Sequence, residues 1–74
     1  MLFGKHMDIE HVFKYHSPTP EQVIKYQAIR DKAKELAQVI IENTPVCADQ
    51  SAALRHLREC VFTANSSIAL NGRL

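Results

Sequence analysis

Cysteine, glycine and long apolar runs are all scarce in this chain, and each scarcity excludes a class of protein. The two cysteines, Cys47 and Cys60, would lie roughly 20 Å apart on one helix, far beyond the ~7 Å that a disulfide can bridge. We therefore expect both thiols to be reduced, as in cytosolic proteins. No apolar run approaches the ~18 residues of a membrane span, and no signal peptide is recognisable. With 2 glycines and 46% hydrophobic residues, disorder is not expected either.

The motifs of common enzymes and metal sites are missing as well. There is no glycine-rich phosphate loop, no nucleophile elbow and no pair of carboxylates beside a histidine. No C-x-x-C or H-x-x-x-H spacing occurs, so neither zinc nor another cofactor is predicted. A formal net charge of +1 is too small for a general binder of duplex DNA or RNA. The sequence predicts a protein that is not an enzyme and that contacts neither duplex nucleic acid nor a membrane.

The sequence contains a clear signal for the start of a helix. Thr19 can cap a helix, Pro20 suits the first helical position, and Gln22 completes a T-x-x-Q capping box. Beyond it, apolar residues recur at alternating spacings of three and four along one helix face: Tyr26, Ile29, Ala33, Leu36 and Ile40. Pro45 disfavours helical geometry at the residue before it. The pattern predicts a helix over residues 20–43.

A second helix follows the same pattern. Its apolar positions alternate in the same way: Leu54, Leu57, Val61, Ala64 and Ile68. Asp49 and Gln50 favour its start and Asn71-Gly72 favours its end, so the expected range is 47–70. A short connector between two helices of similar length requires an antiparallel hairpin. We therefore expect an all-α fold, with one helical hairpin domain over residues 1–74.

The residues before the capping box, 7–18, are expected to form a short N-terminal arm. Ile9, Val12, Phe13 and Tyr15 give the arm enough apolar surface to dock as a turn followed by extended chain. Residues 1–6 precede it, and the sequence at their end is one that cloning junctions often leave. We expect residues 1–6 to derive from such a junction or to be disordered.

Two helices share one mutual face, and this pair carries more apolar surface than that face can cover. Phe62 is the clearest case, because it shares its side of the second helix with Arg55, Arg58 and Ser66. A partner chain explains an aromatic residue there better than solvent does. A wide core stripe is the alternative for small side chains such as Ala28. A chain of this length also rarely builds a core worth more than ~3–5 kcal/mol by itself. We predict a homo-oligomer.

Four residues are candidates for binding an anionic or aromatic ligand. Arg30 and Lys34 are i,i+4 neighbours, and their like charges repel each other unless an anion neutralises them. The alternative is a solvated face on which Asp31 pairs with Lys34. Tyr15 and His16 offer a stacking surface and a hydrogen-bonding edge for a base. The alternative for Tyr15 is that it packs the arm onto the hairpin and keeps its hydroxyl in water.

Across about residues 8–71, the arm, both helices and their connector form one ordered pattern: Phe13, Tyr15, His16, Pro18, Gln22, Lys25, Tyr26, Ile29, Arg30, Ala33, Lys34, Leu36, Ala37, Pro45, Ser51, Ala53, Leu54, Leu57, Val61, Ala64, Asn65, Ile68 and Ala69. This pattern resembles the hairpin domain of the phage anti-CBASS sponge family. The resemblance implies a non-enzymatic sponge that acts in the cytoplasm of the infected bacterial host. Such a sponge captures the signal of CBASS immunity and leaves it chemically intact.

The resemblance also implies a ligand and an assembly. Family members are homo-oligomers, typically hexamers, with pockets between protomers that hold cyclic dinucleotides such as 3′,3′-linked cyclic GMP-AMP (3′,3′-cGAMP). By position, Tyr15 would stack on a base with His16 beside it. Arg30 would contact the phosphates or a base edge, and Lys34 would add positive charge.

Some family members also hold cyclic trinucleotides in separate pockets where three protomers meet. The candidates for such a site here are Asn65, Asn71 and Arg73. Members that hold trinucleotides are expected to carry an Arg near the end of the second helix, whereas Arg73 lies in the tail. The competing interpretation of the whole chain is an oligomeric helical module for protein–protein interaction, with solvated basic residues and no nucleotide ligand.

Overall fold

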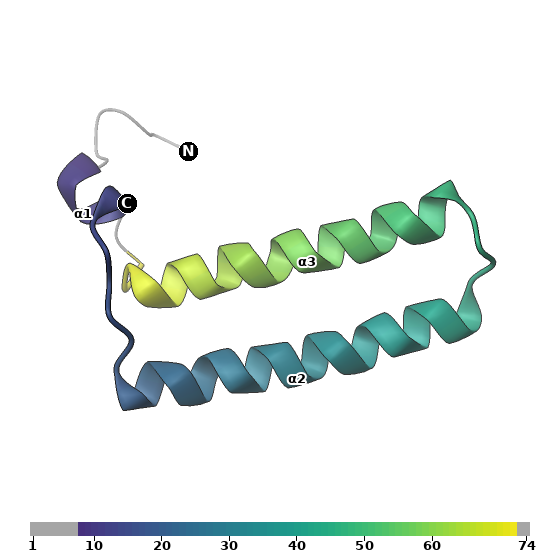
Figure 1. Ribbon diagram of the computed structural model, residues 1–74, viewed down its shortest axis with the longest axis horizontal. Coiled ribbons are helices and arrows are strands. Elements are labelled where there is room, and N and C mark those ends of the chain that lie inside the picture. The colour runs from purple at the N-terminus through teal and green to yellow at the C-terminus, as the bar shows by residue number, and fades with distance from the viewer. Residues whose placement is uncertain (1–7, 73–74) are drawn as a thin grey trace.

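The computed structural model describes residues 8–72, which contain three helices (Figure 1). They are α1 (Ile9–Phe13), α2 (Pro20–Asn43) and α3 (Ala48–Ala69). No strand occurs in this part of the chain, so the all-α prediction is confirmed. The expectations for residues 1–6 and for Arg73 fall outside the described residues.

A capping box determines where α2 begins, and a proline determines where it ends. Thr19 Oγ1 accepts a hydrogen bond from Gln22 N at 3.2 Å, and Gln22 Oε1 accepts one from Thr19 N at 3.0 Å. This reciprocal pair is the predicted capping box, with Pro20 at the start of the helix. At the other end, Thr44 adopts an extended backbone with φ −128° and ψ 150°. It precedes Pro45, whose ring disfavours helical geometry at the preceding residue.

The range Ala48–Ala69 places α3 one residue inside each end of the predicted helix. Cys47 is the N-cap, and its Sγ accepts a hydrogen bond from Gln50 N at 3.5 Å. The thiol thus occupies the position where a hydroxyl or carboxylate usually caps a helix. The side-chain amide of Gln50 also donates to Thr44 O at 3.2 Å and to Thr44 Oγ1 at 3.0 Å. This contact ties the start of α3 to the end of α2.

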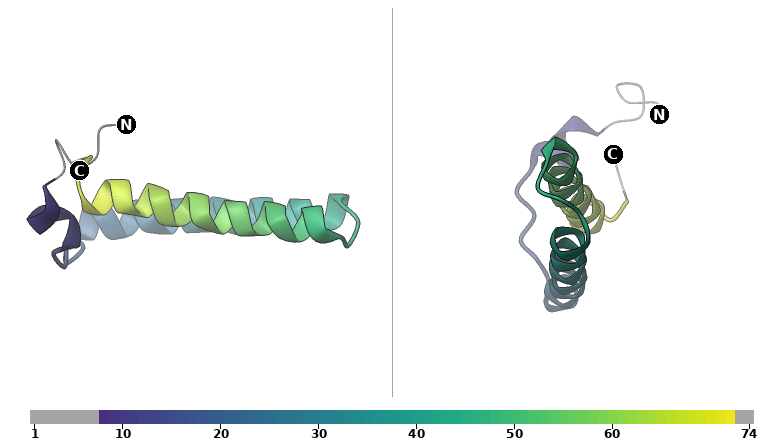
Figure 2. Two further views of the ribbon diagram at one scale, coloured as in Figure 1. Left: turned by 90° about the horizontal axis from the view of Figure 1, so that it is seen from above. Right: turned by 90° about the vertical axis from the view of Figure 1, so that its right-hand side faces the viewer.

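α2 and α3 lie side by side and antiparallel in a single layer (Figures 1 and 2). The molecule measures 43 × 30 × 16 Å, and its shortest extent is little more than the ~10–12 Å diameter of one helix with its side chains. One layer cannot enclose a core. Among residues 8–72, Leu70 is accordingly the one buried hydrophobic residue, with 7% of its surface exposed. The residues between the helices are half-buried, among them Ile29, Ala33, Ile40, Leu57 and Val61.

Large apolar side chains remain exposed on both long helices. Leu36, which was predicted for the contact between the helices, is 49% exposed, while Ile24 and Phe62 are 70% and 62% exposed. Full burial of one such side chain contributes ~1.5–3 kcal/mol, and a single-layer hairpin has few other sources of stability. This exposure is the structural reason to retain the prediction of self-association.

Candidate ligand-binding site

His11 connects the arm to the C-terminal end of α3, and His16 connects two parts of the arm to each other. The short helix α1 begins at Ile9 because Asp8 Oδ1 accepts a hydrogen bond from His11 N at 3.1 Å. His11 Nε2 lies 3.1 Å from Leu70 O, and His16 Nε2 lies 2.6 Å from His11 O. Because a carbonyl oxygen only accepts, each Nε2 carries a proton and donates it. The two imidazole rings meet edge to face, with centroids 4.7 Å apart.

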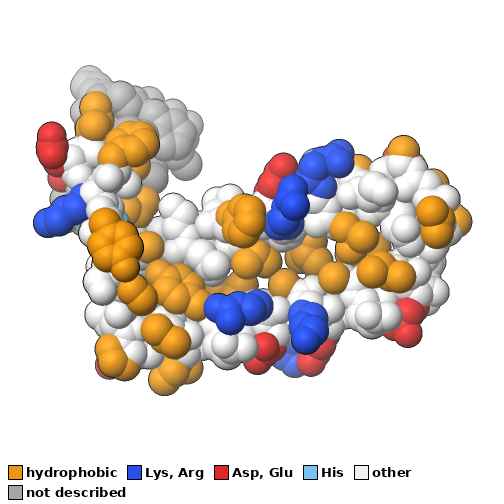
Figure 3. All heavy atoms as spheres, in the orientation of Figure 1, with side chains coloured by type: hydrophobic (Ala, Val, Ile, Leu, Met, Phe, Trp, Pro, Cys, Tyr) orange, Lys and Arg blue, Asp and Glu red, His pale blue; other side chains and the backbone are white. Residues whose placement is uncertain are grey.

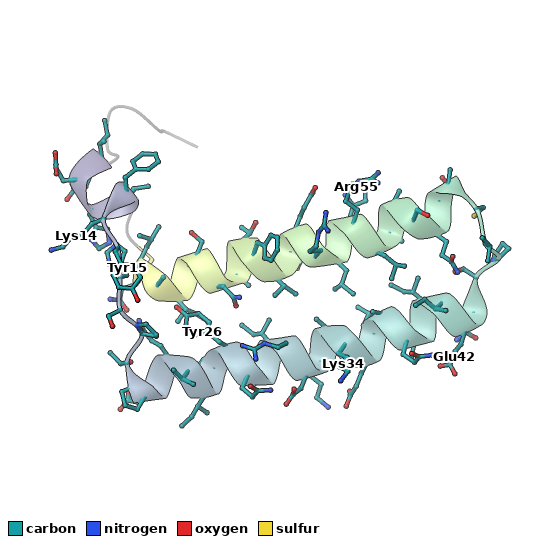
Figure 4. The ribbon with its side chains drawn as sticks, viewed as in Figure 1. Lys14, Tyr15, Tyr26, Lys34, Glu42 and Arg55 are labelled. Carbon is teal, nitrogen blue, oxygen red and sulfur yellow. The ribbon has the colours of Figure 1, made fainter. Side chains whose placement is uncertain are left out.

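Two hydrogen bonds connect the N-terminal part of the chain to the end of α3, and Tyr15 lies between them in the sequence. One is the contact from His11 to α3, and the other is from Gln22 Nε2, which donates to Ile68 O at 3.1 Å. The ring of Tyr15 is 82% exposed, so it does not pack the arm onto the hairpin. His16 is half-buried, and its Nε2 is used within the arm. At this end of the molecule, Tyr15 rather than His16 presents an open surface to a ligand (Figure 4).

Arg30 and Lys34 lie on one side of α2 and have no acidic partner among residues 8–72. Arg30 Nη1 donates to Gln27 Oε1 at 3.2 Å, and Gln27 Nε2 donates to Asp31 Oδ1 at 2.8 Å. Asp31 therefore bonds to Gln27 and not to Lys34, so the solvated ion pair considered from the sequence is absent here. Two neighbouring cations without a counter-charge are poised to bind an anion.

The same two residues line a shallow groove of about 370 Å³ between α2 and α3, which we call the cationic groove. From α3, Arg58 and Phe62 line it as well. The remaining lining is apolar: Ala33, Ala37, Leu54, Leu57 and Val61. Figure 3 shows Lys and Arg side chains on both sides of an apolar strip that runs between the helices. The groove combines an apolar floor with positive charge, which suits an anion that carries flat rings.

One chain does not bring Tyr15 and the cationic groove together. Figure 4 shows Tyr15 at the end of the hairpin where α2 begins, whereas Lys34 lies about midway along α2. Arg30 is ten positions beyond Pro20, or ~15 Å along the helix axis at 1.5 Å per residue. Unless a second chain supplies one of the two residues, a ligand that contacts both Tyr15 and Arg30 would have to extend along the first turns of α2.

Comparison with known protein families identifies the family of this chain. The model of the Acb2/Tad1 hairpin domain matches residues 5–69, which is most of the chain. The chain belongs to this family. The resemblance inferred from the sequence is thereby confirmed. No curated protein and no solved structure matches the chain.

In this Acb2/Tad1 hairpin domain, the residues expected for a trinucleotide site differ in their local environments. Asn65 is half-buried on α3, and its Oδ1 is buried without a hydrogen-bond partner among residues 8–72. Asn71 adopts a left-handed backbone with φ 53° and ends α3 together with Gly72, whose φ is 73°. The backbone N–H of Gly72 donates to Ser67 O at 3.0 Å. Arg73 lies outside the described residues.

Sequence reasoning did not assign Arg58 and Phe62 to the ligand site. Their i,i+4 spacing was a usable signal, because it places both side chains on one side of α3. That this side borders the groove of Arg30 and Lys34 depends on how α2 and α3 pack against each other. The hairpin domain therefore has a candidate site built from both helices.

In the described part of the Acb2/Tad1 hairpin domain, no group of three or more His, Cys, Asp or Glu side chains is placed to hold a metal ion. No helix within residues 8–72 is long and apolar enough to cross a membrane. Cys47 and Cys60 are both free thiols.

Proposed function

We propose that this Acb2/Tad1 hairpin domain is a phage sponge that binds cyclic dinucleotide second messengers such as 3′,3′-cGAMP and sequesters them without cleavage. In the cytoplasm of an infected bacterium, sequestration withholds the signal from the CBASS effector and blocks immunity. Family membership over residues 5–69 carries this proposal. The cationic groove supports it, because Arg30 and Lys34 lie there without acidic partners among the described residues.

Three side chains are proposed to contact the ligand directly, and a fourth, His16, lies beside one of them. Tyr15 stacks on a base with His16 beside it, and Arg30 and Lys34 meet the phosphates. A cyclic dinucleotide carries two phosphates in a compact ring, so one cation from each of two protomers neutralises it symmetrically. The separation of Tyr15 from Arg30 within one chain favours a pocket in which the arm of one protomer meets the groove of another.

The proposed assembly is a homo-oligomer, with a hexamer as its most favoured size. The exposed apolar side chains of the single-layer hairpin supply the surface that such an assembly would bury. A second site, for cyclic trinucleotides, is proposed at Asn65, Asn71 and Arg73. The buried, unpartnered Oδ1 of Asn65 supports a polar contact at this place.

Isothermal titration calorimetry with 3′,3′-cGAMP tests the proposed function. After titration, the protein is denatured by heat and the released ligand is analysed by mass spectrometry. We expect tight binding with a defined stoichiometry and recovery of intact ligand. Linear dinucleotide or mononucleotide products would contradict a sponge.

The competing function is an oligomeric helical module for protein–protein interaction, and the exposed Phe62 is the observation that favours it. This function predicts no heat of binding from any member of a panel of cyclic di- and trinucleotides. A negative result over the whole panel would therefore overturn the sponge and leave the interaction module.

A further inference from the structure

The cationic groove has two walls, and α3 supplies one of them. Arg58 and Phe62 line this wall, one helical turn apart, while Arg30 and Lys34 line the wall of α2. Figure 3 shows the Lys and Arg side chains gathered on either side of the apolar strip. Packed helices lie ~8–10 Å axis to axis, so long side chains on the two walls can reach one compact ligand.

The positive charge on both walls is uncompensated. The acidic residues closest in sequence have other partners: Asp31 accepts from Gln27, Glu35 pairs with Lys32 at 3.2 Å, and Glu59 lies 3.8 Å from His56. Arg58 has no acidic partner among residues 8–72. Three like charges around one groove repel each other, and a ligand with more than one negative charge relieves this repulsion.

Phe62 adds a second feature to the same wall. It is exposed, and it follows Arg58 by one helical turn on the edge of an apolar floor. An aromatic ring beside a cation suits a nucleotide, because the ring can stack on a base while the cation meets the phosphate. An acidic peptide would use the cations but has no equal need for the exposed ring.

We propose that Arg58 is a phosphate-binding residue of the nucleotide site and that Phe62 is its base-stacking partner on α3. The groove then provides cations from both helices, which matches the two phosphates of a cyclic dinucleotide better than the single phosphate of a cyclic mononucleotide. This inference rests on the proposed sponge function and adds a wall that the resemblance to the family did not assign.

The test compares single-residue variants of the full chain by calorimetry with 3′,3′-cGAMP. Arg58→Gln is expected to weaken binding about tenfold or more, as the loss of a charge-assisted hydrogen bond does. Phe62→Leu keeps the apolar volume and is expected to weaken binding less, through loss of ring stacking. Arg55→Gln is the matched control, because it makes the same change on the same helix at an exposed residue that is absent from the cationic groove.

Two further measurements separate binding from folding. Circular dichroism and sedimentation should show that the variants keep the helical content and the assembly of the wild type. The affinity difference between Arg58→Gln and wild type should shrink as salt is raised, since salt screens the contact of an exposed cation with phosphate.

The outcomes distinguish this inference from the function on which it rests. Wild-type binding together with unchanged affinity of Arg58→Gln and Phe62→Leu would overturn the α3 wall and leave the sponge intact. An equal loss in Arg55→Gln would overturn it too, because a general charge effect would then explain the result. Failure of the wild type to bind any cyclic nucleotide would overturn the sponge and this inference together.

Discussion

At the scale of single residues, neighbours in the sequence have different environments. Tyr15 is exposed at the end of the hairpin, whereas His16 donates a hydrogen bond to His11 O and is half-buried. His16 therefore contributes to the shape of the arm, and Tyr15 is left open to a ligand or to another protomer. A mutation at each position should separate these two contributions.

We expect Tyr15→Ala to weaken the binding of 3′,3′-cGAMP by ~1–3 kcal/mol, the usual value of stacking one base on an aromatic ring. The change should leave the free energy of unfolding within ~0.5 kcal/mol, because the ring is exposed. Calorimetry measures the first quantity and urea denaturation of the ligand-free protein the second.

Tyr15→Phe is the matched control for this prediction. It keeps the aromatic face and removes only the hydroxyl, so the affinity should stay close to that of the wild type. An equal loss of affinity in both variants would show that the hydroxyl, and not stacking, binds the ligand. A large loss of stability in Tyr15→Ala would show that the ring supports the fold or the assembly.

At the scale of helices, capping contacts locate the ends of α2 and α3. The Thr19 and Gln22 pair begins α2, and Cys47 begins α3 with a long 3.5 Å contact from Gln50 N to its Sγ. Sulfur is a weak acceptor, whereas serine is among the strongest N-caps. The connector is therefore a place where α3 can be stabilised without any change in the groove.

We expect Cys47→Ser to raise the free energy of unfolding by ~0.5–1 kcal/mol, because a hydroxyl caps the exposed N–H groups of the first turn better than a thiol. Cys47→Ala removes the acceptor altogether and should not stabilise the protein. Thermal melts of both variants, followed by circular dichroism at one protein concentration, check the prediction. Stabilisation by alanine as well as by serine would rule out the cap as the cause.

Gln22 connects two helices, so it should contribute more to the free energy of unfolding than a typical surface residue does. Its Oε1 completes the capping box of α2 while its Nε2 donates to Ile68 O on α3. We expect Gln22→Ala to lower the free energy of unfolding by ~1–2 kcal/mol. Gln38→Ala, at an exposed position of the same helix, should have no such cost. Urea denaturation of the two variants at equal concentration gives the comparison, and similar midpoints would contradict the role of Gln22.

At the scale of the whole molecule, the single layer has two faces of different charge. The cationic groove lies on one side of the contact between the helices. A second groove of about 400 Å³ lies on the other side and has Lys32, which is paired with Glu35, as its one charged lining residue in the described chain. We call it the neutral groove; its apolar lining includes Ala28, Leu36 and Cys60.

These two faces should differ in how they meet a second copy. In a two-fold dimer, each face contacts the same face of its partner, so the cations of the cationic groove would be brought against each other. That contact needs an anion between the chains, whereas the neutral groove can pack on itself without one. We therefore expect the ligand-free protein to associate through the neutral groove and to leave the cationic groove open.

We expect Ala28→Glu to weaken self-association at least tenfold, because it places a carboxylate in an apolar contact. Ala37→Glu is the matched control, since it makes the same change on the same helix but beside the cations. Sedimentation equilibrium of both variants without ligand measures the effect. Weaker association in Ala37→Glu than in Ala28→Glu would place the contact on the cationic side.

Much of the fold could be predicted because its determinants are local. The capping box spans four residues, the apolar spacings of three and four repeat within single helices, and Pro45 acts on the residue before it. The short helix α1 was expected only as a turn, although Asp8 lies in the sequence as its cap. Leu36 belongs to the apolar repeat but is half exposed, because a single layer covers only part of a helix face.

By itself, the sequence determined the two long helices, their antiparallel return and the family to which the chain belongs, since each depends on residue types at short and regular spacings. Only the tertiary structure decided that His11 reaches Leu70 and that Gln22 reaches Ile68. It also decided that Arg58 and Phe62 share a groove with Arg30. These partners are 28 to 59 positions apart, so they meet only through the docking of α1 at the end of α3 and the rotation and register of α2 against α3, which no local spacing encodes.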